Sequence, residues 1–376
     1  MTIEKVSIVG MGSLGLIFGS FLMDRLGGDK VEFVLDQKRL EKYSGVERLI
    51  NGKGYHFNLV PGEEKGKPAD LIIFAVKSTG LDEAIRTVRN KVGEDTIIIS
   101  LLNGITSEKI IGEAFGREKL LYTIAEGMDP IRSGHNLDYT RMGQVRIGID
   151  EETEKKREML KEVLDIFDRT GFPYTLEDDV MQRLWSKFML NVGVNQVVMI
   201  HEGNYDTVQK PGPARDLMVG AMREVIKLAE RENIKITEAD IDYYVALIDS
   251  LNPQGMPSMR FDGLNRIRSE VDLFSGMVLE LGKKHGLPTP INQEIYGSNA
   301  PWRAWRGCCR RSEPSLRREG PGQAGVSRST PCSPPSSSTS APRAAKRPLV
   351  TTPTMALSLA SMATGSSIMK SKQSRI

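Results

Sequence analysis

A glycine-rich loop near the N-terminus, Gly10-Met11-Gly12-Ser13-Leu14-Gly15, is the feature that most constrains the fold. It follows the β-branched apolar run VSIV and opens the apolar segment LIFGSFLMDRL. Between a strand and a helix, the first glycine permits a tight turn and the second lets a pyrophosphate reach backbone N–H groups. The third lets the helix pack closely on the sheet. The loop therefore predicts dinucleotide binding, against the alternative of a purely structural glycine turn.

Short apolar runs alternate with helix-length segments over the first half of the chain. The clearest runs lie at 6–10, 31–35, 71–76 and 96–102. Runs that are apolar on both faces and separated by helices are typical of buried parallel strands. The pattern predicts an α/β fold with a Rossmann-type doubly wound sheet. Further strands are expected at 55–60, 136–140 and 144–149, the last two as an antiparallel pair.

The pattern changes near residue 178 to long segments with helical periodicity. These segments cover 178–200, 214–232, 238–250 and 258–285. We therefore expect a dinucleotide-binding domain over 1–175 and an all-helical substrate and catalytic domain over 176–297.

Residues 298–376 form a basic tail rich in Ser, Pro and Arg. This composition predicts disorder, because it offers little apolar surface to bury. Two alternatives are a basic arm that binds a partner and a shifted reading frame, since the ordered pattern stops abruptly at NQEIYG. Every candidate site residue precedes the tail.

Charge and cysteine content narrow the class of protein. The net charge is +3, but residues 298–376 hold 13 Lys and Arg against two Glu, so residues 1–297 are net acidic. An acidic body argues against nucleic-acid binding. All three cysteines lie in the tail, and no histidines have metal-ligand spacing, so we expect no metal site. The N-terminus carries no signal sequence and no run of about 18 apolar residues occurs, which favours the cytoplasm and no membrane partner.

The residue after the second strand bears on the choice of cofactor. Asp36 lies where a carboxylate binds the 2′-OH of an adenosine ribose, which favours NAD(H). Gln37, Lys38 and Arg39 could instead bind the 2′-phosphate of NADP(H). A third interpretation is that Asp36 only caps the following helix.

Three polar residues share one face of the first long helix. Lys187, Asn191 and Asn195 are spaced i, i+4 and i+8 in RLWSKFMLNVGVNQVVM. One ammonium and two carboxamides in an apolar setting indicate a pocket for a polyoxygenated ligand, because buried amides need partners. A polar stripe that meets water or another helix is the alternative.

Three more candidates rest on position. Lys77 and Asn103 follow strands at the carboxyl edge of the sheet, where ligands of such sheets bind. Glu270 lies in a segment whose helical period would bury Leu264, Ile267, Val271, Phe274 and Met277, and it could be an ordinary exposed glutamate.

Taken together, these motifs resemble the ketopantoate reductase (2-dehydropantoate 2-reductase) family. GMGSLG, AVKS, LLNG, K-x3-N-x3-N, PSMRFD and SEVDLFSG occur in that family's order and spacing over roughly residues 3–296. The resemblance implies a Rossmann domain, a helical domain and an active site in the cleft between them. It also implies reduction of 2-dehydropantoate to pantoate by a nicotinamide dinucleotide, in pantothenate biosynthesis.

The resemblance also assigns roles to residues. It implies that Lys187 is the catalytic lysine, which donates a hydrogen bond or proton to the ketone oxygen, and that Glu270 lies near the substrate hydroxyl and the nicotinamide ribose. Substrate contacts are implied for Asn103, Asn191, Asn195 and Ser258. Cofactor contacts are implied for Lys77, Asn103, Glu270 and the glycine loop.

Two departures from the family leave alternatives open. Many members carry Arg where this chain has Asp36, so NADP(H) follows from the resemblance and NAD(H) from the residue itself. The family's last helix also continues beyond Tyr296, where this chain enters the tail. The alternatives are a related dehydrogenase of another 2-oxo or 3-hydroxy acid, and a non-catalytic NAD(P)-binding regulator. We expect a small 2-oxo acid as substrate and a homodimer as one form of assembly.

Overall fold

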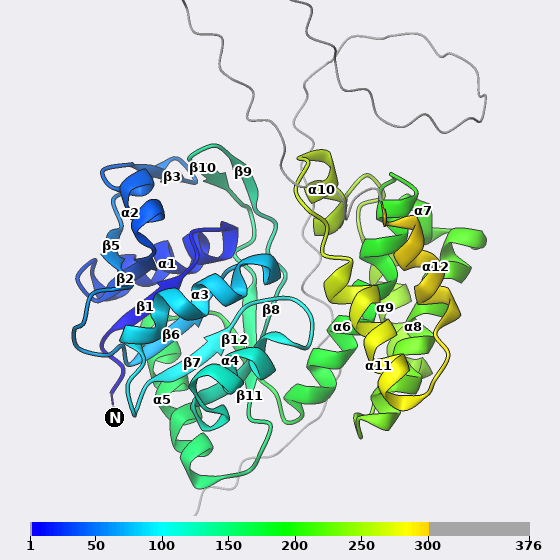
Figure 1. Cartoon of the computed structure of the whole chain (residues 1–376). Helices are drawn as coiled ribbons and strands as arrows, with labels where there is room; N and C mark the ends of the chain where they lie inside the picture. Colours follow the sequence, from blue (N-terminus) through cyan, green and yellow to red (C-terminus); the bar gives the residue numbers. More distant parts are fainter. Residues whose placement is uncertain (1, 301–376) are drawn as a thin grey trace, which may run out of the picture. The chain divides into compact units, whose positions relative to one another are not determined.

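An eight-stranded sheet lies at the centre of the N-terminal half in a computed structural model, which describes residues 2–300 (Figure 1). The described residues belong to one compact unit, Met1–Cys308. Six strands are parallel and β11 is antiparallel to β8. The strands in spatial order are β12 (Tyr174–Leu176), β11 (Gln144–Gly148), β8 (Leu120–Glu126), β7 (Ile97–Ser100), β6 (Leu71–Phe74), β1 (Val6–Val9), β2 (Val31–Leu35) and β5 (Asn58–Pro61).

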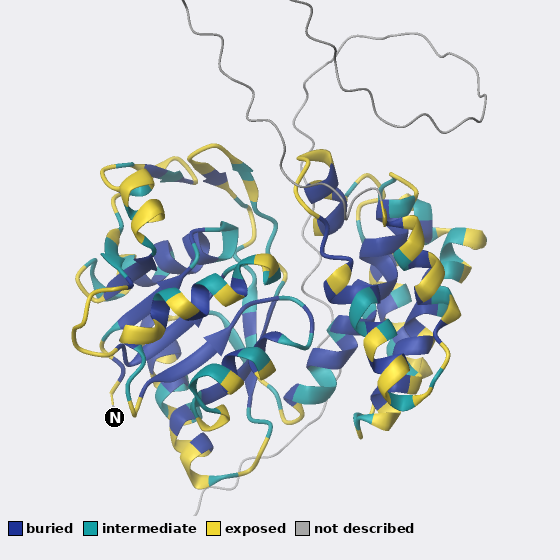
Figure 2. Cartoon of the chain, viewed as in Figure 1, coloured by how far each residue is buried: buried dark blue, intermediate teal, exposed yellow. Residues whose placement is uncertain are grey.

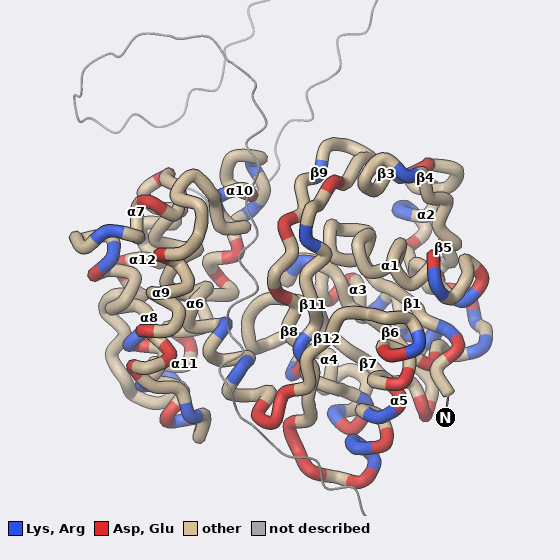
Figure 3. Tube along the Cα trace, turned by 180° about the vertical axis from the view of Figure 1, so that it is seen from behind, with Lys and Arg blue, Asp and Glu red and all other residues tan. Residues whose placement is uncertain are grey.

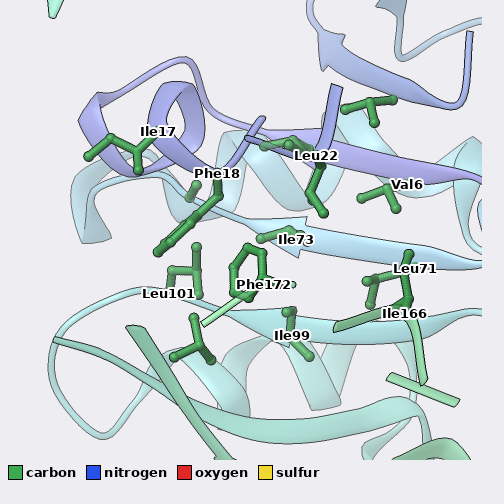
Figure 4. Packing of buried hydrophobic residues seen from close by; sticks show 14 of the residues in the cluster. Val6, Ile17, Phe18, Leu22, Leu71, Ile73, Ile99, Leu101, Ile166 and Phe172 are labelled. Atoms are coloured by element: carbon green, nitrogen blue, oxygen red, sulfur yellow. The ribbon is translucent and has the colours of Figure 1, made fainter. Parts of the chain in front are cut away.

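Helices cover both faces of this sheet, as the apolar runs predict. One core contains side chains of α1 (Ser13–Leu26) and α5 (Glu154–Thr170), and another contains those of α3 (Leu81–Val88) and α4 (Ser107–Phe115). Phe18 and Phe172 pack with ring centroids 4.9 Å apart in the first core (Figure 4). Charged residues lie mostly on the surrounding helices and loops (Figure 3). Shorter helices are α2 (Gln37–Tyr43), η1 (Ser78–Gly80), η2 (Arg89–Lys91) and η3 (Arg117–Lys119).

A second, four-stranded sheet was not expected. Its order is β4 (Lys53–Tyr55), β3 (Arg48–Ile50), β10 (Asn136–Asp138) and β9 (Ile131–Ser133). The predicted antiparallel pair of 136–140 with 144–149 is therefore wrong. β10 pairs with β9 and β3, whereas β11 pairs with β8 and β12. Alternation shows which side chains share a face but does not choose the partner strand.

The C-terminal half is helical and packs around one buried helix, α6 (Val180–Ile200). α6 is apolar on nearly all sides, which is typical of a buried helix (Figure 2). Its first turn is capped by Asp179, whose side chain accepts a hydrogen bond from the Gln182 N–H at 2.9 Å. The other helices are α7 (Asp206–Gln209), α8 (Pro213–Arg231), α9 (Glu238–Ser250), α10 (Ser258–Leu264), η4 (Asp272–Gly276), α11 (Met277–His285) and α12 (Pro290–Ser298).

The predicted continuous helix over 258–285 is wrong. α10 ends at Leu264, Arg266 adopts a left-handed φ of 57°, and η4 is π-helical. Leu264 and Ile267, expected in the core, are 53% and 41% exposed, whereas Val271 and Phe274 are buried as predicted. The interruption removes the i, i+3, i+4 relation between the two halves of the segment. A π-helical turn of this kind frequently occurs at a functional site.

The expectations for residues 301–376 of the tail, including the three cysteines, lie outside the described residues. The first residues of the predicted tail are described: α12 ends at Ser298 and Asn299 is buried, so the helical part extends past the predicted boundary at 297. Within residues 2–300 no helix is long and apolar enough to cross a membrane. The same residues contain no group of three or more His, Cys, Asp or Glu placed to hold a metal ion.

Candidate active site

The glycine loop has the geometry that a phosphate-binding turn requires. Gly10 has φ +111°, and a Cβ there would lie 2.5 Å from the Ala75 carbonyl oxygen. A Cβ on Gly15 would lie 2.0 Å from the Gly10 carbonyl oxygen, whereas one on Gly12 would meet nothing closer than 3.6 Å. α1 begins at Ser13 without a side-chain cap and without an acidic residue in its first turn. The open space at Gly12 and the uncapped helix N-terminus fit a pyrophosphate.

Asp36 caps α2, which was one of the three interpretations of this residue. Its Oδ1 accepts a hydrogen bond from the Arg39 backbone N–H at 2.9 Å, and its Oδ2 pairs with the Arg39 guanidinium. Burial alone would raise the pKa of Asp36, but the hydrogen bonds and the ion pair with Arg39 outweigh this effect and lower it. Arg39 also donates to Glu83 at 2.9 Å. Both a ribose diol at Asp36 and a 2′-phosphate at Arg39 would have to compete with this existing pair.

Lys187 on α6 reaches the carboxyl edge of the sheet. Its Nζ donates to Asn103 Oδ1 at 3.0 Å and to the Ala125 carbonyl oxygen at 2.6 Å. Lys187 is partly buried, with its ammonium group held between Asn103 and the Ala125 carbonyl. This burial lowers the pKa of Lys187 to about 8, against the opposing charge of Glu126. A lysine with this pKa exchanges its proton near neutral pH, which suits a general acid and base.

Glu270 lies beside the same asparagine and is 8% exposed, so it is not the ordinary surface glutamate that its position in the sequence allowed. Burial raises the pKa of Glu270, whereas the charge of Lys77 and a hydrogen bond from Asn103 act in the opposite direction. Lys77 Nζ in turn pairs with Asp262 Oδ2 at 2.5 Å. Asn103 therefore connects Lys187 with Glu270, and Lys77, paired with Asp262, lies close enough for its charge to act on Glu270.

The two asparagines of α6 form a second group with the start of α10. Asn195 Nδ2 donates to Asn191 Oδ1 at 2.9 Å, and both side chains are buried. Asn195 Oδ1 accepts from Ser258 Oγ at 3.4 Å and from the Met259 N–H at 3.3 Å. The i, i+4, i+8 spacing therefore places one basic and two amide groups in a row along α6.

Sequence reasoning missed two participants in this arrangement. The Ala125 carbonyl lies at the end of β8, a strand that was not expected. Asp262 lies inside the PSMRFD motif, but nothing in the sequence indicated its contact with Lys77, which is 185 residues away. Asp262 is 8% exposed, and a buried carboxylate needs a cation nearby.

Family comparisons identify the chain. Residues 6–151 match the family described as Ketopantoate reductase PanE/ApbA, and residues 179–298 match Ketopantoate reductase PanE/ApbA C terminal. The chain belongs to the ketopantoate reductase family. The two matches leave out the tail and the segment from 152 to 178, which contains α5 and β12.

Relatives of this ketopantoate reductase match over most of its length. The 2-dehydropantoate 2-reductase of Aquifex aeolicus is 28% identical over 304 residues, which cover 78% of this chain and 95% of that enzyme. The enzyme of Pyrococcus horikoshii is 24% identical, over 77% of this chain and 94% of its own.

Solved structures show the same fold. D-mandelate dehydrogenase in complex with NADH has a TM-score of 0.71 at 21% identity, covering 80% of this chain and all of that one. 2-Dehydropantoate 2-reductase from Geobacter metallireducens has a TM-score of 0.68 at 22% identity, covering 78% and 98%. These two neighbours act on different substrates, so the shared fold does not by itself choose one.

Proposed function

We propose that this member of the ketopantoate reductase family reduces 2-dehydropantoate to pantoate with a nicotinamide dinucleotide, and that Lys187 is the general acid of this reaction. The observation that carries the proposal is the Lys187 ammonium, fixed on Asn103 and the Ala125 carbonyl. Family membership and the relatives named 2-dehydropantoate 2-reductase support the substrate. The open glycine loop supports the cofactor.

The chemistry asked of Lys187 is proton transfer. Reduction adds a hydride to the ketone carbon and a proton to the ketone oxygen. When bound, the nicotinamide cofactor supplies the hydride, and Gly10, Gly12 and Gly15 would hold its pyrophosphate. Lys187 donates to the oxygen as negative charge develops there, so it stabilises the transition state more than the ground state. Asn103 and the Ala125 carbonyl hold the ammonium in place during this transfer.

The remaining polar groups would hold the rest of the substrate and cofactor. Asn191, Asn195 and Ser258 supply amide and hydroxyl groups suited to a carboxylate and a hydroxyl. Glu270 would accept a hydrogen bond from a hydroxyl group of the substrate or the cofactor. Burial raises the pKa of Glu270, which makes its ionised carboxylate more basic and therefore a stronger acceptor. Lys77 and Asn103 would lie at the nicotinamide end.

The test uses the purified full chain and the absorbance of the reduced nicotinamide. We expect oxidation of NADPH or NADH to depend on 2-dehydropantoate, with a kcat/KM far above that for phenylglyoxylate, the 2-oxo acid that corresponds to mandelate. Rapid oxidation with phenylglyoxylate but not with 2-dehydropantoate would instead favour a second candidate function, a dehydrogenase of another 2-hydroxy acid. Binding without turnover of any 2-oxo acid would favour a regulator.

That second candidate is an NADH-dependent dehydrogenase of another 2-hydroxy acid. Two observations favour it: the likeness to NADH-bound D-mandelate dehydrogenase and the carboxylate at Asp36. Neither observation concerns the side chains that would determine substrate specificity. The first candidate is preferred because both family matches and the relatives agree on ketopantoate.

The pH dependence of kcat should report on Lys187. Reduction needs its protonated form, and its pKa is about 8. We expect kcat for reduction to be level below about pH 7 and to fall up to about tenfold per unit above pH 8. Oxidation of pantoate needs the neutral amine, so its kcat should rise over the same range. Two profiles that fall together would contradict this assignment.

Replacing Asp36 by arginine should shift cofactor preference toward NADPH. The variant removes a carboxylate that repels a 2′-phosphate and supplies a group that can pair with it. We expect the NADPH/NADH ratio of kcat/KM to rise by about tenfold or more. Asp36→Asn is the matched control, because asparagine still caps α2 but carries no charge, and its ratio should move less. An unchanged ratio in Asp36→Arg would make Asp36 a helix cap only.

Three broader expectations stay predictions. Separate hydrophobic cores on the two sides support a domain division near residue 175. A ketopantoate reductase of Staphylococcus aureus with a TM-score of 0.67 at 19% identity is described as dimeric, which supports a homodimer here. The third expectation, localisation in the cytoplasm, stays a prediction.

A further inference from the structure

A basic side chain that is not among the residues discussed above reaches the glycine loop, and a second one lies near it. Arg132 on β9 donates from Nη1 to the Met11 carbonyl oxygen at 3.0 Å, and Met11 is the second residue of that loop. Arg48 on β3 is 2% exposed and donates from Nη1 to His135 Nδ1. The unexpected four-stranded sheet therefore brings one guanidinium group, that of Arg132, to the cofactor loop, and Arg48 is close enough to Arg132 for their charges to interact.

Arg48 lacks the partners that a buried guanidinium needs. Its Nε and Nη2 are buried and make no hydrogen bond to any residue between 2 and 300. Its cationic carbon lies 4.7 Å from the centre of the Tyr43 ring. The pKa of Arg48 is lowered by burial and then by the charge of Arg132, so the two cations lie close enough to repel each other.

A buried cation without a carboxylate partner costs several kcal/mol of folding free energy, so such a group calls for a functional explanation. The surroundings of Arg48 and Arg132 supply one. Met11 and Tyr43, the residues that these arginines contact, both line a cavity of about 150 Å³. An anion bound at the glycine loop would supply the negative charge that balances Arg48 and Arg132.

We propose that Arg132, with Arg48 behind it, binds the pyrophosphate of the dinucleotide cofactor. The proposal rests on the proposed function, which requires such a cofactor. Arg132 would exchange the neutral Met11 carbonyl for phosphate oxygens, a stronger partner because a phosphate carries the opposite charge and can accept two parallel bonds from the guanidinium. Arg48 is a positioning residue: its charge adds to the potential at the loop, and it holds the β9–β10 turn through His135.

The test is binding of NADPH and NADH to the full chain, followed by the fluorescence of the reduced nicotinamide. We expect Arg132→Gln to weaken both cofactors by about tenfold or more, because it removes one charge-assisted contact. Arg48→Met fills a similar volume without charge and should weaken both by about threefold to tenfold. Arg89→Gln removes an exposed arginine of η2 and should leave both dissociation constants unchanged.

Melting temperatures without cofactor separate a binding role from a structural one. A binding role predicts that Arg48→Met melts at the same temperature as the parent or higher, because an unpaired buried charge has been removed. A lower melting temperature with unchanged cofactor binding would overturn the proposal. Weakening of NADPH alone would assign the arginines to the 2′-phosphate and overturn it as well. If the parent chain binds neither cofactor, the proposed function itself fails.

Discussion

Replacement of Lys187 by alanine is expected to lower kcat for reduction by about 10²–10³-fold, the usual loss when one preorganised donor to a developing oxyanion is removed. The dissociation constants of NADPH and NADH should hardly change, because the ammonium contacts Asn103 and the Ala125 carbonyl rather than the glycine loop. Stopped-flow turnover and fluorescence titration of the same preparation measure the two quantities.

Two further variants sharpen this result. Lys187→Arg keeps a positive charge but does not release its proton, so it should retain part of kcat and lose the fall above pH 8. Lys235→Ala removes an exposed lysine of the helical half and serves as the matched control, with kcat unchanged. A Lys187→Ala enzyme within threefold of its parent would remove Lys187 from the mechanism.

The α6 residues of the site could be predicted because the information lies within one helix. Lys187, Asn191 and Asn195 share a face by periodicity alone, and the glycine loop is defined by six consecutive residues. Lys77 and Asn103 followed from the rule that ligands bind at the carboxyl edge of a parallel sheet. Both residues do lie at that edge, after β6 and β7.

The parts that sequence reasoning missed depend on distant partners. Which strands pair depends on the segments that pack beside them in the fold, so β10 pairs with β3 and β9 and not with β11. The helix expected through Glu270 is interrupted, and the interruption places Glu270 beside Asn103 instead of on a surface. In the sequence Arg48 is one basic residue among many, in a segment for which no strand was predicted. Only the folded structure shows that it is buried without a carboxylate.

Glu126 provides the other large expected effect, because it is the centre of an ion cluster between the sheet and α6. It accepts from Arg146 Nε at 2.5 Å and from Arg183 Nη2 at 2.6 Å. About a fifth of each of the three side chains is exposed. Glu126→Gln leaves the largely buried Arg183 without the carboxylate that it pairs with, whereas Arg146 keeps its second pair, with Glu177. Breaking such a cluster on one side is expected to cost about 3–5 kcal/mol of unfolding free energy, which urea denaturation of the full chain measures.

The same variant should also change catalysis, since the charge of Glu126 is the largest of those that oppose the lowering of the Lys187 pKa. Without that charge the pKa falls further, so the decline of kcat for reduction should begin at a lower pH than in the parent. Glu152→Gln is the matched control: it breaks the exposed pair with Arg157, 3.0 Å apart, and should cost less than about 1 kcal/mol without moving the profile. The unfolding free energy therefore tests whether Glu126 holds α6 on the sheet, and the pH profile tests whether it acts on the proton of Lys187. A loss of stability with an unchanged pH profile would support the first role and contradict the second.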